Sequence, residues 1–114
     1  MSVWEKIAEE KIREAMAAGE FDDLPGAGKP LDLSEYFSLP ETTRLAFSIL
    51  KNAGFVPREV ELLKEIAALR ELLAAAGDEE RRDALRREIA EVRLQLDIML
   101  ERRRRRPPPD RSIG

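Results

Sequence analysis

Two apolar stripes of the same period, one on each side of Gly77 and Asp78, most constrain the fold of this chain. The first stripe comprises Leu62, Ile66, Leu69, Leu73 and Ala76. The second comprises Leu85, Ile89, Val92, Leu96 and Met99. Both alternate steps of four and three, which is typical of amphipathic helices that pack along one another. Gly77 favours a helix end and Asp78 a new N-cap, so we predict a long antiparallel, coiled-coil-like hairpin over residues 55–106.

The second helix of this hairpin is longer than the first. Folding back at 77–78 brings Leu62 near Arg93 and Ile66 near Ile89, so the apolar residues of 94–100 extend past the start of the first helix. They point in several directions and need more than one neighbour. We expect residues 40–55 to supply one, and homo-oligomerisation through helix 85–100 to supply the other. Along the second helix we expect the i,i+4 pairs Asp78–Arg82 and Asp83–Arg87.

Two further helices are predicted in residues 1–54. The first spans Val3–Ala18, has capping-box spacing between Ser2 and Glu5, places Glu5 on its polar side and ends at Gly19. The second spans Pro40–Ala53, with Ser38 and Glu41 at capping-box spacing. Gly54 and Phe55 then have the order of a Schellman end, in which Phe55 contacts Leu50.

Residues 19–33, GEFDDLPGAGKPLDL, form a connection that amphipathic packing does not explain. Its length predicts a segment that is either functional or packed. We interpret Phe21, Leu24, Leu31 and Leu33 as anchors on the helices, with a short helical turn at 34–37 after them. The polar residues Glu20, Asp22, Asp23 and Lys29 are then left to face a partner or to pair with one another.

No catalytic constellation stands out. The chain has no Cys and no His, which removes thiolate ligands, the commonest general base and the commonest metal ligand. The segment PGAGKP is not a Walker A loop, because Asp23 occupies the place of its first Gly and Pro30 that of its Ser or Thr. The carboxylates of residues 20–35 lack the spacing of an EF-hand. We therefore predict a non-enzyme without metal or cofactor.

The basic run Arg102, Arg103, Arg104, Arg105 and Arg106 gives an alternative. Such a cluster can bind RNA or an acidic lipid surface in a salt-dependent way. It also suits a solvated helix end, where positive charge is favourable. The net charge of −3 speaks against nucleic-acid binding by the whole domain. The prolines after the run predict a disordered tail over 107–114.

The stretches IAEEKIREAMAAGEFDDLPGAGKPLDL and LAFSILKNAGFVPREVELLKEI closely resemble a conserved domain of unknown function. That domain occurs in small bacterial proteins and in a eukaryotic J-domain protein of subfamily C, and the resemblance covers about residues 5–75. It implies an unassigned module associated with chaperone-type proteins. A J-domain acts through a His-Pro-Asp loop, and this chain has no His.

The sequence thus predicts a single all-α domain over 1–106, with a helix-loop-helix at 1–54 before the hairpin. Without a signal peptide or an apolar run of membrane-spanning length, we expect a cytoplasmic bacterial protein. Its predicted function is protein interaction, as an adaptor associated with chaperone machinery. The candidate partner-binding residues are Glu20, Phe21, Asp22, Asp23, Leu24, Pro25, Gly26, Gly28, Lys29, Pro30 and Leu31.

Overall fold

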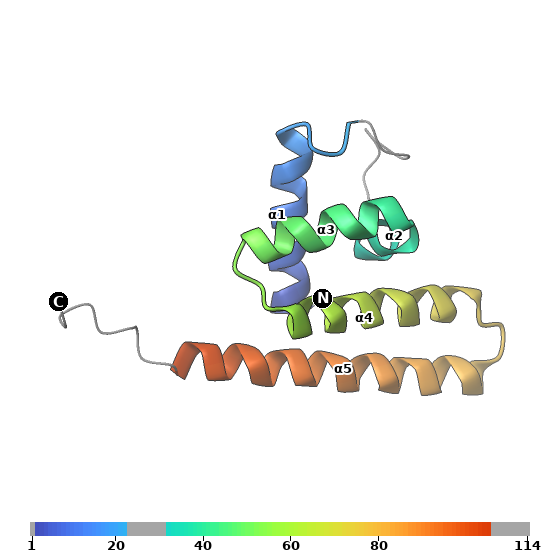
Figure 1. Ribbon diagram of the computed structural model, residues 1–114. Helices are drawn as coiled ribbons and strands as arrows, with labels where there is room; N and C mark the ends of the chain where they lie inside the picture. The colour runs from blue at the N-terminus through green and yellow to red at the C-terminus, as the bar shows by residue number, and fades with distance from the viewer. Residues whose placement is uncertain (1, 23–31, 106–114) are drawn as a thin grey trace.

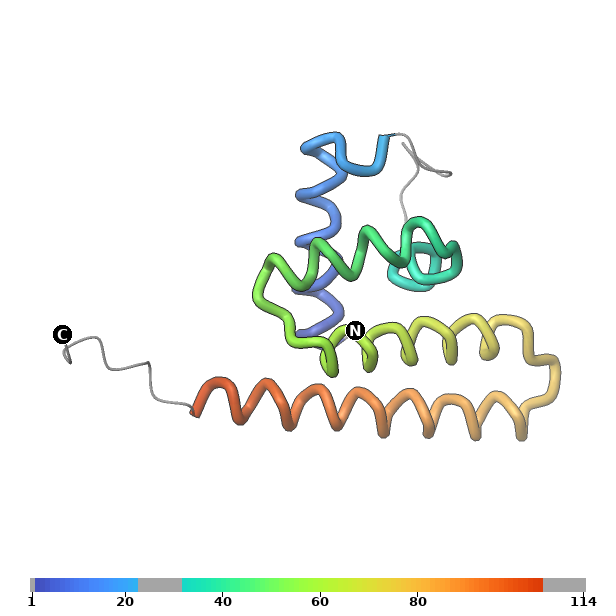
Figure 2. The backbone as a smooth tube through the Cα atoms, viewed as in Figure 1, coloured from blue at the N-terminus to red at the C-terminus, as the bar shows by residue number. Residues whose placement is uncertain are grey.

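A computed structural model describes residues 2–22 and 32–105, which form five helices and no strand. The helices are α1 (Val3–Ala17), α2 (Leu33–Ser38), α3 (Pro40–Asn52), α4 (Pro57–Ala75) and α5 (Glu79–Arg105). The predicted all-α fold class is confirmed. In Figure 1, α4 and α5 lie side by side and run in opposite directions, α1 stands across them, and α3 lies over α4. Figure 2 shows the same path as a tube, with α2 directly before α3.

The core is built from side chains of all five helices, and Trp4 is buried in it. The Nε1–H of Trp4 donates to the carbonyl of Leu96 on α5, and its ring meets Phe55 edge-on at 5.2 Å. An indole buries a large apolar area and still finds a partner for its N–H in this way. The first residues of the chain are therefore held against the distal half of α5 (Figure 1).

Two glycines end helices in the left-handed conformation. Gly19 has φ +86° after α1 and Gly54 has φ +96° after α3. The amide of Phe55 donates to Leu50 (2.9 Å), and the amide of Gly54 donates to Lys51 (3.0 Å). These two bonds form the Schellman motif that the sequence predicted, and they return Phe55 to the core.

The N-caps agree with the sequence predictions at one helix and differ at another. At α1 the hydroxyl of Ser2 accepts from the amide of Glu5 at 3.3 Å, as predicted. The prediction that Ser38 caps the next helix is wrong, because the expected short turn extends into α2 and Ser38 is its last residue. The Ser38 hydroxyl instead donates to the carbonyl of Glu35 (2.8 Å), and the N-cap position of α3 is Leu39, which has no capping side chain.

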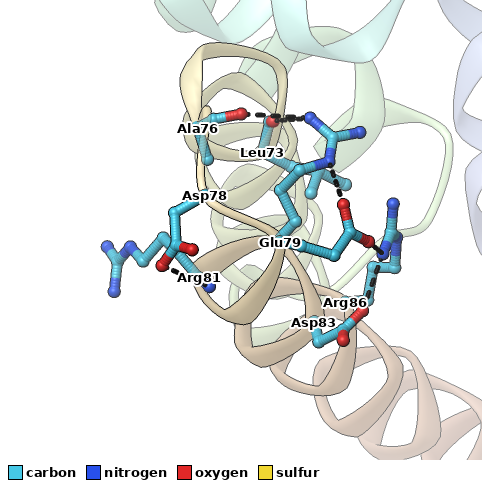
Figure 3. A network of polar contacts seen from close by, with 8 residues as sticks. Leu73, Ala76, Asp78, Glu79, Arg81, Asp83 and Arg86 are labelled. Atoms are coloured by element: carbon cyan, nitrogen blue, oxygen red, sulfur yellow. Dashed lines mark hydrogen bonds and ion pairs between the residues drawn. The ribbon is translucent and has the colours of Figure 1, made fainter.

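The turn between α4 and α5 is closed by a polar network (Figure 3). Asp78 accepts from the amide of Arg81 at 3.3 Å and so caps α5, as predicted. Arg82 does not pair with Asp78. It donates to two carbonyls at the end of α4, those of Leu73 (3.0 Å) and Ala76 (3.2 Å). The Leu73 carbonyl also accepts from the amide of Ala76 (3.3 Å). Carbonyls in the last turn of a helix lack the usual i+4 donor, so a guanidinium from the next helix adds a hydrogen bond to both.

The second predicted ion pair of α5 also differs. Asp83 pairs with Arg86 at 2.8 Å rather than with Arg87, and Arg86 also contacts Glu79 at 3.1 Å (Figure 3). Spacings of three and four both place side chains on one face, so the spacing alone does not choose between them. In the part of the chain that the structure describes, no helix is long and apolar enough to cross a membrane.

Candidate interaction surface and its anchors

The motif segment, defined as residues 19–33, is fixed to the core at its N-terminal end. After Gly19, the amide of Glu20 donates to Ala15 (3.1 Å) and that of Asp22 donates to Gly19 (3.2 Å). This tight turn directs the Phe21 side chain inward, where it is buried. Glu20 is exposed at the edge of a groove between the C-terminal ends of α1 and α3, and Asp22 is exposed as well.

Phe21 is held by an aromatic contact with α2. Its ring lies 5.3 Å from that of Tyr36, and the hydroxyl of Tyr36 donates to the sulfur of Met16 at 2.6 Å. Burial is the main reason why the pKa of Tyr36 is raised above 10.0, with the Arg13 charge acting in the opposite direction. This contact ties the turn after α1 to α2.

The C-terminal end of the motif segment is fixed as firmly. Asp32 caps α2 by accepting from the amide of Glu35 at 3.0 Å, and Leu33 is fully buried in the same core as Phe21. Burial raises the pKa of Glu9 on α1, and Asp32 adds to this shift while Arg13 opposes it. Both flanks of the motif segment therefore rest on one hydrophobic core.

The structure separates the candidate partner-binding residues into three groups. Phe21 is buried and serves as an anchor, so it is not presented to a partner. Glu20 and Asp22 remain accessible. The others lie outside the described residues: Asp23, Leu24, Pro25, Gly26, Gly28, Lys29, Pro30 and Leu31.

The arginine run is divided by its contacts. Arg103 donates to the carbonyl of Gly54 (2.9 Å) and to Glu59 (3.0 Å), and its guanidinium lies 5.1 Å from the centre of the Trp4 ring. It thus fastens the end of α5 to α1 and to the α3–α4 turn. Arg102 and Arg104 are exposed, Arg105 is exposed and 3.5 Å from Glu101, and Arg106 lies outside the described residues.

Residues 7–74 match the family model described as the conserved domain of DnaJ homologue, subfamily C, member 28. The chain belongs to this family. It is similar to two uncharacterised bacterial proteins. YflB of Bacillus subtilis is 38% identical over 97 residues, which are 85% of this chain and 75% of that protein. YhdN of Escherichia coli is 41% identical over 73 residues, which are 64% of this chain and 60% of that protein. No solved structure is significantly similar to the chain.

The family match spans the motif segment and ends within α4, which agrees with the sequence resemblance over 5–75. Both matching relatives are uncharacterised, so the family assignment brings no catalytic residues with it. Among residues 2–22 and 32–105, no group of three or more Asp or Glu side chains is placed to hold a metal ion.

Sequence reasoning missed a buried ionic cluster, the Glu5 cluster, formed by Glu5, Arg70 and Arg93. The prediction that Glu5 lies on the polar side of α1 is wrong, because its side chain is 0% exposed. One carboxylate oxygen accepts from Arg70 on α4 and the other accepts from Arg93 on α5 at 2.8 Å. Burial, and then the charge of Arg93, lower the pKa of Arg70.

The signal for this cluster was weak in the sequence. Glu5 has the capping-box position after Ser2, and the acids that follow it are only half-buried (Glu9) or exposed (Glu10). Its partners are 65 and 88 positions away. The cluster joins three helices through one carboxylate, so it fixes α1 on the α4–α5 pair.

Proposed function

We propose that this chain is a non-enzymatic protein-interaction module associated with chaperone machinery, and that it binds its partner through Glu20–Leu31. One observation carries the proposal. Phe21 and Leu33, which flank the segment richest in Gly and Pro, are both buried in the same core. Flanks anchored in this way lower the entropy that the segment loses on binding, which favours recognition over a role as a simple linker.

The family assignment supports the chaperone part of the proposal. The family takes its description from a DnaJ homologue. The accessible residues at the segment's entry, Glu20 and Asp22, are acidic, and Lys29 adds one positive charge within the segment. A surface of this kind suits polar recognition of a protein partner, with the anchors supplying rigidity.

The test uses residues that do not support the core. Tagged wild type is compared with Asp22→Lys/Lys29→Glu in pull-downs from lysates of Bacillus subtilis and Escherichia coli. The control, Glu71→Lys/Arg81→Glu, makes the same charge exchange at exposed positions of α4 and α5. We expect wild type and control to retain a chaperone protein that the Asp22/Lys29 variant loses. Recovery of the same proteins by all three folded chains contradicts the surface assignment.

A second candidate function is binding of RNA or acidic lipid through the arginine run. The observation in its favour is that Arg102 and Arg104 are exposed and make no ion pair within the described part of the chain. Its test is titration with RNA or acidic liposomes at two salt concentrations. Arg102→Gln/Arg104→Gln/Arg105→Gln retains the structural Arg103 and should abolish binding. Unchanged binding by this variant refutes the assignment.

A further inference from the structure

The exposed side of α5 carries a second stripe that the core does not use. Its members recur at alternating steps of three and four, and all are exposed. We call it the outer stripe: Glu88, Glu91, Gln95, Ile98, Arg102 and Arg105. Its two acids lie toward the start of the helix and its two bases toward the end, with Gln95 and Ile98 between them.

The outer stripe faces away from α1. Arg93, which contacts Glu5 on α1, is two positions from both Glu91 and Gln95, or about 200° around the helix. The stripe instead borders an open groove between α4 and α5 with a volume of about 560 Å³. The groove contains apolar side chains, Leu69 and Val92, and its carboxylates are those of Glu65, Glu88 and Glu91. An occupant with positive charge therefore suits this side of the helix.

We propose that the occupant is a second copy of this chain, with the two α5 helices antiparallel and the two-fold axis between Gln95 and Ile98. The charges of the stripe are complementary in this arrangement. Glu88 and Arg105 are equally far from this axis, as are Glu91 and Arg102, so each acid faces a base of the partner subunit. The symmetry repeats each pair, which gives four ion pairs between the subunits.

Other arrangements lose this match. A parallel pair in register places each acid opposite the same acid and each base opposite the same base. The antiparallel pair also covers apolar surface, because Ile98, which is 44% exposed, lies at its centre. The contact of Arg105 with Glu101 is exposed on both sides, so it can exchange for a new partner at little cost.

This inference does not rest on the proposed chaperone association. It assigns Arg102 and Arg105 to the subunit interface rather than to an anionic surface, and it leaves the motif segment free. An isologous interface closes after two copies, so the expected assembly is a dimer and not a fibre.

The test is analytical ultracentrifugation of the full chain over a range of protein concentrations at low and high salt. We expect wild type to reach twice its monomer mass of 13.0 kDa at low salt and to dissociate as salt rises. Glu88→Lys/Glu91→Lys leaves only positive charges on the stripe, and Arg102→Glu/Arg105→Glu leaves only negative ones. Each alone should be monomeric, and an equimolar mixture should form a heterodimer with all four ion pairs restored.

The control Glu71→Lys/Asp97→Lys changes the net charge as Glu88→Lys/Glu91→Lys does, but at exposed positions outside the outer stripe. It should dimerise like wild type. Circular dichroism checks that every variant is folded. A monomeric wild type, or a mixture of the two charge variants that fails to associate, overturns the proposal. If the Arg102/Arg105 variant loses RNA or liposome binding without a change in mass, the arginines serve an anionic surface and the dimer is wrong.

Because the chain has no Cys, single cysteines report the orientation. A Gln95→Cys chain and an Ile98→Cys chain are mixed, with tags of different length so that the crosslinked products can be told apart. In the antiparallel dimer, position 95 of one subunit lies opposite position 98 of the other, so the mixed disulfide should form in preference to either homodimer. Preferential crosslinking of each variant to its own kind indicates a parallel pair and refutes the antiparallel arrangement.

Discussion

Removal of the Glu5 carboxylate is the most informative single perturbation of this fold. Glu5→Ala leaves the guanidinium groups of Arg70 and Arg93 close together without the anion that both contact. Loss of one partner from a buried ion pair costs roughly 3–5 kcal/mol. The Arg70 and Arg93 side chains are 22% and 33% exposed, so both regain some hydration, and we expect a loss of about 2–4 kcal/mol in the free energy of unfolding.

The assay is urea denaturation followed by the fluorescence of Trp4, which is buried and is the only tryptophan in the chain. Linear extrapolation gives the free energy of unfolding, and an unchanged slope shows that the same surface is exposed on unfolding. Wild type and variant are compared at two protein concentrations, because self-association adds to apparent stability.

Two further variants separate charge from packing. Glu5→Gln keeps the shape and one acceptor, so its loss should be smaller than that of Glu5→Ala. Glu5→Leu/Arg70→Met/Arg93→Met removes all three charges, and replacement of a whole buried cluster by apolar residues is often neutral. We expect this triple variant to be more stable than Glu5→Ala. A loss below about 0.5 kcal/mol for Glu5→Ala shows instead that the carboxylate is solvated and that the reasoning is wrong.

Three further outcomes are expected. Ile66→Ala should cost about 2–5 kcal/mol in urea denaturation because Ile66 is fully buried, whereas Leu72→Ala, at a side chain 49% exposed, should cost little; equal losses contradict this placement. Gly54→Ala should cost about 1 kcal/mol because Gly54 has φ +96°, and Gly77→Ala, at a glycine without positive φ, should not destabilise; the reverse order refutes the Schellman end. Tyr36, the only tyrosine, has a raised pKa in the folded chain, so the stability that its neutral form contributes is complete below pH 10 and is lost as pH rises through the folded-state pKa. Tyrosinate absorbance followed against pH is the measurement, and its appearance below pH 10 in the folded chain contradicts the burial of Tyr36.

The motif segment shows how far sequence reasoning reaches at the candidate site. Hydrophobic anchors were predicted at Phe21 and Leu33, and both are buried. Phe21 was also a candidate contact residue, which its burial excludes. The sequence pattern identified apolar residues in an irregular connection, but an apolar side chain can either anchor the connection in the core or contact a partner protein. Only its packing against Tyr36 distinguishes the two roles.

The arginine run shows a similar limit. As a sequence, Arg102–Arg106 is one basic cluster, and nothing in it marks one member. In the structure Arg103 lies over the Trp4 ring and contacts Glu59, while Arg102 faces another side of α5. Successive residues of a helix differ by about 100° in direction, so a uniform run always divides between the core and the solvent.

The sequence by itself determined the helices and most of their ends. Capping at Ser2 and Asp78, and the turns at Gly19 and Gly54, depend on bonds within a few residues, and local sequence is sufficient for these. The Glu5 cluster and the place of Arg103 were decided only by the tertiary structure. A buried carboxylate is tolerated only where a positive charge contacts it. For Glu5 the positive charges are those of Arg70 and Arg93, which are 65 and 88 positions further along the chain.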